Sequence, residues 1–158
     1  MSAIDIETAM HHLLAEPEDQ DLVQAMLDAA EESAAQFIQR RIYADQVSLD
    51  ADRLLVPELR ANARAVYEQS IAAADEVSAG CDRQSAIKDA EFIYGVALVD
   101  ADSRVYGVVL NPAIQAACLL ILGHLFANRE DVIVGSAVAE MPMGSRPLLM
   151  PYRIKMGV

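Results

Sequence analysis

The chain has 158 residues, of which 54% are hydrophobic and 23% charged, so it can bury a core and is not disordered as a whole. Its formal net charge is −12, and residues 1–79 hold 16 acidic and 5 basic side chains. An acidic half disfavours non-specific nucleic-acid binding, which depends on Lys and Arg. These acids are either solvated helix faces or a surface that repels DNA passing nearby.

The hydrophobic content is high for a free monomer and indicates surface buried between subunits. Cys81 and Cys118 are far apart in the sequence, which fits a reduced cytoplasmic setting better than a disulfide framework. The N-terminus has no basic region followed by an uninterrupted apolar run, so no signal peptide is expected.

The N-terminal part predicts two helices. Asp5 can cap a short helix over Ile6–Leu14, and Pro17 ends that pattern. A second helix is expected from about Asp21 to Arg41. Its predicted core-facing stripe consists of Leu22, Met26, Ala30, Ala34, Phe37 and Ile38.

The middle region, residues 44–110, has weaker patterns. Residues 46–56 could hold a short strand, and Pro57 is expected to open a third helix that runs to about Ala79, before Gly80 as a stop. Residues 82–94 predict another short helix, and residues 95–110 could be extended.

The segment 111–130, NPAIQAACLLILGHLFANRE, is the strongest helix signal. Asn111 is a good N-cap, and Pro112 suits the first turn. The run is apolar on all sides, so the helix should be covered on all sides. It is too short for the roughly 20 residues of a membrane span. We therefore expect an all-α fold, a small helical bundle around this central helix.

Residues 132–138 have β character and predict a short arm. The following segment, residues 140–158, is irregular and apolar, with a turn of helix near Leu148 and Leu149. Such a tail either folds back on the domain's own core or docks on a partner. We predict docking; in the alternative, Leu148 and Leu149 cap the core beside the central helix.

Chemistry-bearing motifs are absent: there is no phosphate loop, HExxH, CxxC or GxSxG. The neighbours His11 and His12 point about 100° apart on a helix, which disfavours a shared metal. Asp100 and Asp102 are interpreted as turn residues, and His124 as a hydrogen-bonding residue of a core or interface. The sequence predicts neither an enzyme nor a cofactor or metal site.

Two blocks of the chain resemble the phage head–tail connector family. The C-terminal block has a Pro-capped apolar helix ending in His-x-x-x-Asn-Arg-Glu, followed by a Leu-Pro-like dipeptide, a Gly, a Leu-Leu pair and Pro-Tyr-Arg. The matching interaction residues here are His124, Asn128, Arg129, Glu130, Met141, Pro142, Leu148, Leu149, Pro151, Tyr152 and Arg153. The N-terminal block, a short helix, acidic turn and long Ala-rich helix, is similar as well. The blocks cover residues 1–43 and 111–154, and residues 44–110 are an enlarged middle region of this single predicted domain.

The resemblance implies a structural protein of a tailed phage or prophage, made in the bacterial cytoplasm and built into the virion. It would form a closed homo-oligomeric ring, twelve-fold to match the portal, under the portal protein. A stopper or tail-completion protein would dock onto the ring, and DNA would pass through without sequence-specific binding. No membrane is implied. The alternative is a small helical protein-binding or regulatory module that acts as a dimer.

Overall fold

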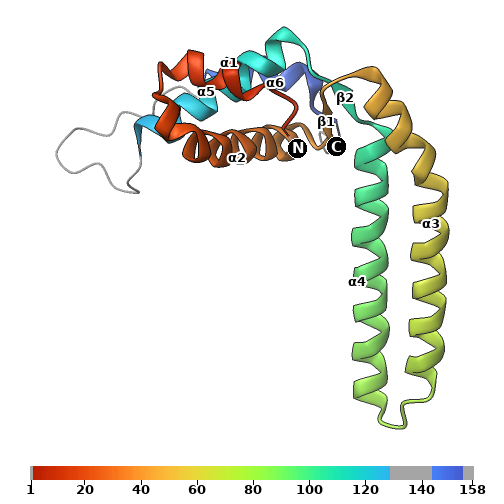
Figure 1. The fold of residues 1–158 in the computed structure, drawn as a ribbon. Coiled ribbons are helices and arrows are strands. Elements are labelled where there is room, and N and C mark those ends of the chain that lie inside the picture. The colour runs from red at the N-terminus through yellow and green to blue at the C-terminus, as the bar shows by residue number, and fades with distance from the viewer. Residues whose placement is uncertain (1, 129–143, 155–158) are drawn as a thin grey trace. The chain divides into compact units, whose positions relative to one another are not determined.

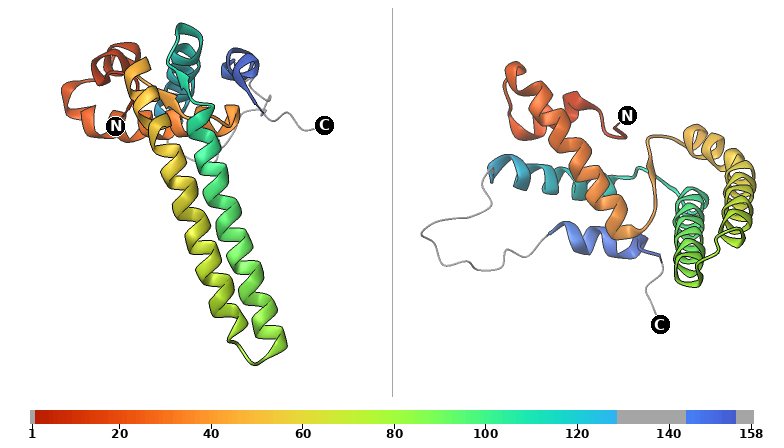
Figure 2. Two further views of the ribbon diagram at one scale, coloured as in Figure 1. Left: turned by 90° about the vertical axis from the view of Figure 1, so that its right-hand side faces the viewer. Right: turned by 90° about the horizontal axis from the view of Figure 1, so that it is seen from below.

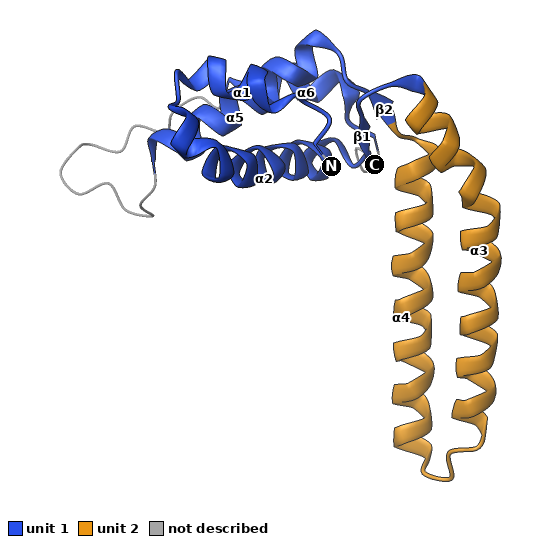
Figure 3. Ribbon diagram, viewed as in Figure 1, with its two compact units in different colours: residues 1–46, 108–158 blue, residues 47–107 orange. Residues whose placement is uncertain are grey.

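The computed structural model describes residues 2–128 and 144–154. The chain divides into two compact units, residues 1–46 with 108–158, and residues 47–107 (Figure 3). The elements (Figure 1) are α1 (Ile6–Leu13), the 3-10 helix η1 (Pro17–Asp19), α2 (Gln20–Ile38), β1 (Ile42–Tyr43), α3 (Gln46–Asp75), α4 (Gly80–Val105), β2 (Val108–Val109), α5 (Pro112–Ala127), α6 (Ser145–Leu149) and the 3-10 helix η2 (Met150–Tyr152). The fold class is all-α, as the sequence predicts.

The first unit begins with two capped helices. The Asp5 carboxylate accepts a hydrogen bond of 3.3 Å from the backbone N–H of Thr8, as predicted for the start of α1. Helix α2 ends at Ile38 rather than at Arg41, because Gln39 turns left-handed with φ 58°. The Gln39 N–H then bonds the carbonyls of Ala35 and Gln36, which closes the last turn.

The buried face of α2 differs by one residue from the predicted stripe at its N-terminal end. The buried residues are Val23, Leu27, Ala30, Ala34 and Ile38. Leu22 is 38% exposed and Met26 is half-buried. Leu22 and Val23 are both apolar, as are Met26 and Leu27, so the hydrophobic period could not show which residue of each pair is buried. Val23 and Leu27 are buried because they lie on the same face of the helix as Ala30, Ala34 and Ile38.

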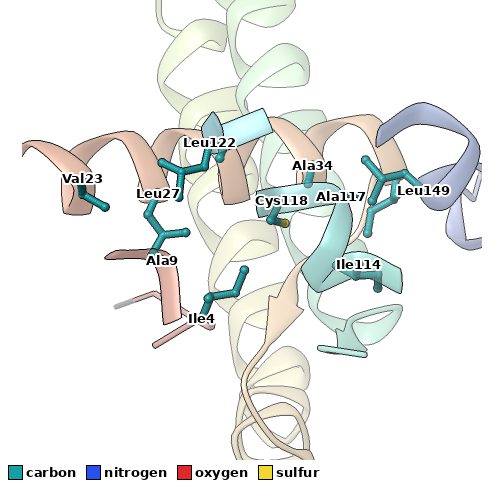
Figure 4. Close-up of a cluster of buried hydrophobic side chains, with 12 residues drawn as sticks. Ile4, Ala9, Val23, Leu27, Ala34, Ile114, Ala117, Cys118, Leu122 and Leu149 are labelled. Atoms are coloured by element: carbon teal, nitrogen blue, oxygen red, sulfur yellow. The ribbon is translucent and has the colours of Figure 1, made fainter. Parts of the chain in front are cut away.

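Helix α5 is the centre of the first unit. The Asn111 Oδ1 accepts hydrogen bonds from the N–H groups of Ala113 and Ile114, at 3.0 and 3.1 Å, and so confirms the predicted cap. The helix packs on α1, α2 and α6. Its buried side chains, Ile114, Ala117, Cys118 and Leu122, join Ile4, Ala9, Val23, Leu27, Ala30, Ala34, Ile38 and Leu149 in one cluster (Figure 4).

The prediction that this helix is covered on all sides is wrong within the described residues. Leu120 is 48% exposed, and Ala116 is also exposed. Three neighbouring elements cover most of the apolar circumference, and part of the face away from α2 stays open.

Two short parallel strands join the segments on either side of the second unit. β1 pairs with β2 in the register Ile42↔Val108 and Tyr43↔Val109. The N–H of Leu110 donates to the Tyr43 carbonyl at 2.8 Å. Of the two predicted extended segments, 46–56 and 95–110, only Val108 and Val109 lie in a strand.

The second unit is a hairpin of two long antiparallel helices, α3 and α4 (Figure 1 and Figure 2). Residues 46–56 are helical, and Pro57 lies inside α3 instead of opening it. Gly80 starts α4 instead of ending α3, and α4 continues through residues 95–105. The sequence-based boundaries are therefore wrong here. A proline removes one backbone hydrogen bond, but α3 continues through Pro57, and Leu49 and Val56, which precede it on the same helix, are buried.

Polar pairs connect the two helices of the hairpin. Arg60 Nη2 lies 2.8 Å from Asp102 Oδ1, Arg104 Nη1 lies 2.6 Å from Asp52 Oδ1, and Arg83 pairs with Asp75. The rings of Tyr67 and Tyr94 stack with centroids 4.9 Å apart. Their positions fix the register of α3 against α4 along its whole length.

Asp100 and Asp102 are helical, so their interpretation as turn residues is wrong. Asp100 lies 3.1 Å from the Nε of Arg104, one turn away on α4. Burial lowers the pKa of Arg104, but hydrogen bonds and charges of Asp100 and Asp52 outweigh it and raise that pKa above its ordinary value. The guanidinium therefore stays charged and holds the open end of the hairpin together.

The hairpin has little core of its own. Its buried hydrophobic residues are Leu49, Val56, Ala74, Ala90 and Ala101, and none belongs to the large cluster around α5. The unit covers residues 47–107, which nearly coincides with the enlarged middle region 44–110. The description of the whole chain as one connector-like domain stays a prediction.

Candidate interaction surfaces

His124 and Asn128 form the C-terminal end of α5. The His124 side chain is exposed, and its Nδ1 lies 3.2 Å from the Nδ2 of Asn128. Asn128 also directs its backbone N–H and its Nδ2 to the His124 carbonyl, at 3.0 and 2.9 Å. The His-x-x-x-Asn spacing is thus a helix-end motif, which leaves one edge of the imidazole facing solvent.

Leu148 and Leu149 belong to the first unit's own core. Leu149 is 2% exposed and lies beside Ala117 and Ile114 (Figure 4), and Leu148 packs against the same cluster. This is the arrangement of the alternative in which the pair caps the core beside the central helix. It holds for residues 144–154; whether the tail also docks on a partner stays a prediction.

Pro151, Tyr152 and Arg153 lie at the C-terminal end of α2. The Tyr152 carbonyl accepts a 3.3 Å hydrogen bond from Arg40, and the Ile154 N–H donates to the Ile38 carbonyl at 3.1 Å. The Arg153 guanidinium lies 5.2 Å from the centroid of the Phe37 ring. Its buried Nε has no hydrogen-bond partner among the described residues.

Among residues 2–128 and 144–154, the structure does not bring the predicted interaction residues into one site. α5 and α6 pack together with Gly144 near Leu120, so η2 continues away from the end of α5 that carries His124. The two described groups therefore lie at different ends of the unit. Arg129, Glu130, Met141 and Pro142 lie outside the described residues.

A carboxylate that sequence reasoning missed anchors the N-terminal segment. Glu31 accepts hydrogen bonds from Ser2 Oγ and from the backbone N–H groups of Ala3 and Ile4, at 2.7, 2.9 and 2.8 Å. This places Ile4, 2% exposed, in the core. A break in the hydrophobic period of α2 would have been the only signal, and acidic residues are too common there to single it out.

Replacing Glu31 with Ala should lower the free energy of unfolding by about 1–3 kcal/mol, because two backbone N–H groups lose a charged acceptor. The matched control is Glu32→Ala. Glu32 is exposed and, among the described residues, accepts a hydrogen bond only from Gln36 Nε2, one turn away, at 2.9 Å. Urea unfolding of both variants measures the difference; equal stabilities would show that the anchor contributes nothing.

A depression beside this anchor is lined by two carboxylates that already accept hydrogen bonds from the chain. It has a volume of about 440 Å³ and is lined by Ser2, Ile4, Asp5, Ile6, Gln24 and Asp28. The Asp5 carboxylate caps α1 and that of Asp28 accepts from Gln24 at 2.9 Å. Across residues 2–128 and 144–154, no group of three or more His, Cys, Asp or Glu side chains could hold a metal ion.

The two cysteines have opposite environments. Cys81 is exposed and Cys118 is fully buried on α5. Burial, together with the charge of Glu31, raises the pKa of the Cys118 thiol to about 12. The buried thiol of Cys118 therefore stays protonated and unreactive under conditions in which the exposed thiol of Cys81 can react.

In the folded protein a thiol reagent at mildly alkaline pH should modify Cys81 and leave Cys118 until the chain unfolds. The pKa of Cys118 in the folded protein lies above the ordinary 9.0 of the unfolded chain. The contribution of the protonated thiol to the stability of the fold is therefore complete below pH 9.0 and is lost as the pH rises towards about 12. Counting modified thiols before and after adding denaturant checks this. Rapid reaction of both thiols in the native state would contradict the buried position.

Most of the exposed large hydrophobic side chains among the described residues lie on the hairpin. Ten of the fourteen belong to residues 47–107. On α4 they include Phe92, Val96 and Val99, exposed by 72, 54 and 59%. Contiguous exposed apolar surface of this kind marks a protein–protein contact more often than it marks a free face.

No family model, curated protein or solved structure matches this chain. No helix in the part of the chain that the structure describes is long and apolar enough to span a membrane.

Proposed function

We propose that this chain is a head–tail connector subunit of a tailed phage or prophage. The observation that carries the proposal is the match between sequence and structure in the first unit. The segments that resemble the connector family are residues 1–43 and 111–154, and the chain's first compact unit consists of residues 1–46 and 108–158. The resemblance therefore follows a physical unit with one core, although it was found in two separated stretches.

The packing of that unit supports the same proposal. The family-like C-terminal block supplies α5 and α6, and the N-terminal block supplies α1 and α2. These four helices share one hydrophobic cluster. A residue of the resembling string can belong to the core that presents a surface, as Leu149 does here.

In the proposed role the subunits form a closed ring, twelve-fold to match the portal protein that the ring would sit beneath. A stopper or tail-completion protein would bind the opposite side of the ring. DNA would pass through the channel without sequence-specific contacts, and the net charge of −12 would keep the duplex from adhering to the subunits. The virion's head–tail junction would be its location.

Deletion of the gene from the phage or prophage that carries it tests this role. We expect DNA-filled heads and separate tails to accumulate in the lysate, with infectious titre lost and then restored by the gene supplied in trans. Electron microscopy of the lysate and plaque counts are the measurements. Complete, infectious particles formed without the protein would overturn the proposal.

A second candidate is a helical protein-binding module that acts as a dimer. The apolar side of α4, exposed in the single chain, favours it. A dimer and a ring differ in mass and in the symmetry of their contacts, so the experiments below separate them.

A further inference from the structure

The hairpin of α3 and α4 carries apolar or small side chains on both of its outer faces. On α4 the outer stripe consists of Phe92, Val96 and Val99, at helical spacings of four and three residues. On α3 the outer stripe consists of Ala61, Ala65 and Ala72, all exposed. An α-helix rotates by 100° per residue. Tyr67 of α3 and Ala90 and Tyr94 of α4 lie on the inner faces of the hairpin, so each stripe points away from the partner helix.

The two stripes are complementary at the same height along the hairpin. The pairs Arg60–Asp102 and Tyr67–Tyr94 set the register in the middle of the hairpin, where the numbers of two residues at one level add up to about 161; towards the two ends the pairs Arg83–Asp75 and Arg104–Asp52 give 158 and 156. Phe92 is then level with residue 69, and Val99 with residue 62. Val96 and Val99 thus stand at or beside the heights of Ala65 and Ala61, and Phe92 stands at the height of Glu68 and Gln69, between Ala65 and Ala72.

We propose that the outer face of α4 packs on the outer face of α3 in a second copy of this chain. Phe92 would enter the space bounded by Ala65, Glu68, Gln69 and Ala72. Val99 would enter the space bounded by Glu58, Ala61, Asn62 and Ala65. Each space is defined by residues i, i+3, i+4 and i+7, as in knobs-into-holes packing, and both knobs and spaces repeat every seven residues.

Charge adds to this fit. Lys88 makes no ion pair within the described residues, and it lies on the outer side of α4, one turn from Phe92. Its level corresponds to residues 70–73, so in the neighbouring copy it falls between Glu68 and Glu76. The hairpin carries more acidic than basic residues, and this lysine would meet that excess.

The hairpin also needs such a neighbour. Two helices with five buried hydrophobic side chains bury too little surface to hold long helices on their own, because most helical stability comes from packing of an apolar face. A third helix on each side, supplied by neighbouring copies, places every long helix between two others.

Because two different faces meet, the contact is head-to-tail and can repeat. The 26 residues of α4 span about 39 Å at 1.5 Å per residue. A helix face of that length and about 10 Å width buries about 400 Å² on each copy, half of the ~800 Å² per partner in a stable isolated interface. A single pair should dissociate readily, whereas closure gives each copy two such contacts. The statement that the contacts close into a ring rests on the proposed function. The contact between two copies does not depend on it.

Cysteine cross-linking of the whole chain tests the contact. In a Cys81→Ser background, Val96→Cys and Ala65→Cys would meet across the proposed interface, since their numbers also add up to 161. Within one hairpin the two cysteines lie on opposite sides, about 20 Å apart, so a bismaleimide whose spacer is shorter than this distance cannot join them. On a denaturing gel the double variant should give a ladder of cross-linked dimers, trimers and larger species. Each single variant should give no cross-linked species.

Adding Phe92→Glu to the double variant should reduce the cross-linked yield by about tenfold or more. The matched control is Val66→Glu: Val66 is 53% exposed but lies on the side of α3, off the stripe. The control should keep the ladder, and circular dichroism should show equal helix content in both variants.

Dimers from Val96→Cys alone would show a symmetric α4–α4 contact, and an unchanged ladder in Phe92→Glu would show a different surface; either result overturns the inference. The proposed function fails separately. Rings that persist in Phe92→Glu would leave the connector role intact without this contact, and a ladder that never closes into rings would leave the contact without the connector role.

Discussion

Replacing Leu122 with Asp should leave the chain unfolded or insoluble, with a loss of at least about 4 kcal/mol. Leu122 has no exposed surface and lies in the cluster that α5 forms with α1, α2 and α6. A carboxylate there has no partner and must either stay charged in an apolar environment or take up a proton. Either choice consumes a large part of the 5–15 kcal/mol that stabilises an average domain.

The matched control is Leu120→Asp on the same helix. Leu120 is 48% exposed, so its carboxylate can remain in water, and stability should change by about 1 kcal/mol or less. Expression in the soluble fraction and thermal unfolding followed by circular dichroism compare the two. If Leu122→Asp melted like Leu120→Asp, α5 would not be the centre of the first unit.

Ending the chain after Ala139 should destabilise the first unit strongly. The truncation removes Leu149 from the core and the hydrogen bonds that join Tyr152 and Ile154 to the end of α2. Removal of one buried leucine side chain alone costs about 2–5 kcal/mol. The docking-tail hypothesis, in its simple form, expects instead that the truncated chain melts as the whole chain does.

Two point variants separate core packing from other effects of truncation. Leu149→Ala should lower stability by about 2–5 kcal/mol, and Met150→Ala, at a position 45% exposed, should change it little. Chemical denaturation of the three variants beside the whole chain provides the comparison. Unchanged stability in Leu149→Ala would return residues 140–158 to the docking hypothesis.

Where one strong local signal acted alone, the sequence predicted the structure well. Asp5 and Asn111 cap their helices as expected, because a side-chain oxygen near free backbone N–H groups needs no tertiary context. The all-α class follows from the same long apolar periodicities. Leu149 could be assigned only to one of two environments, because composition does not say whether an apolar tail packs on its own domain.

The hairpin was predicted poorly because Pro57 and Gly80 were given too much weight. Both residues usually mark boundaries, yet Pro57 lies within α3 and Gly80 begins α4. The contacts that override them join residues 42 to 52 positions apart, such as Arg60 with Asp102 and Asp52 with Arg104. Such pairs cannot be read from a local window.

The candidate surfaces divide in the same way. The His124–Asn128 spacing was visible because it is a local helix-end pattern. The sequence named this pair together with Tyr152 and Arg153 as interaction residues, without saying whether they share a surface. Helix packing separates the two groups. The stripe of Phe92, Val96 and Val99 was missed because the segment 95–110 was expected to be extended, and a strand would not place these residues on one face.

The mass of the purified chain in solution tests the central claim most directly, since a connector subunit must assemble into a closed ring. Mass photometry and negative-stain microscopy of the same sample should find one large, ring-shaped species. Twelve copies of the 17.1 kDa chain correspond to about 205 kDa. A chain that stays at one or two copies over the whole accessible concentration range, with no rings in the images, would contradict the account.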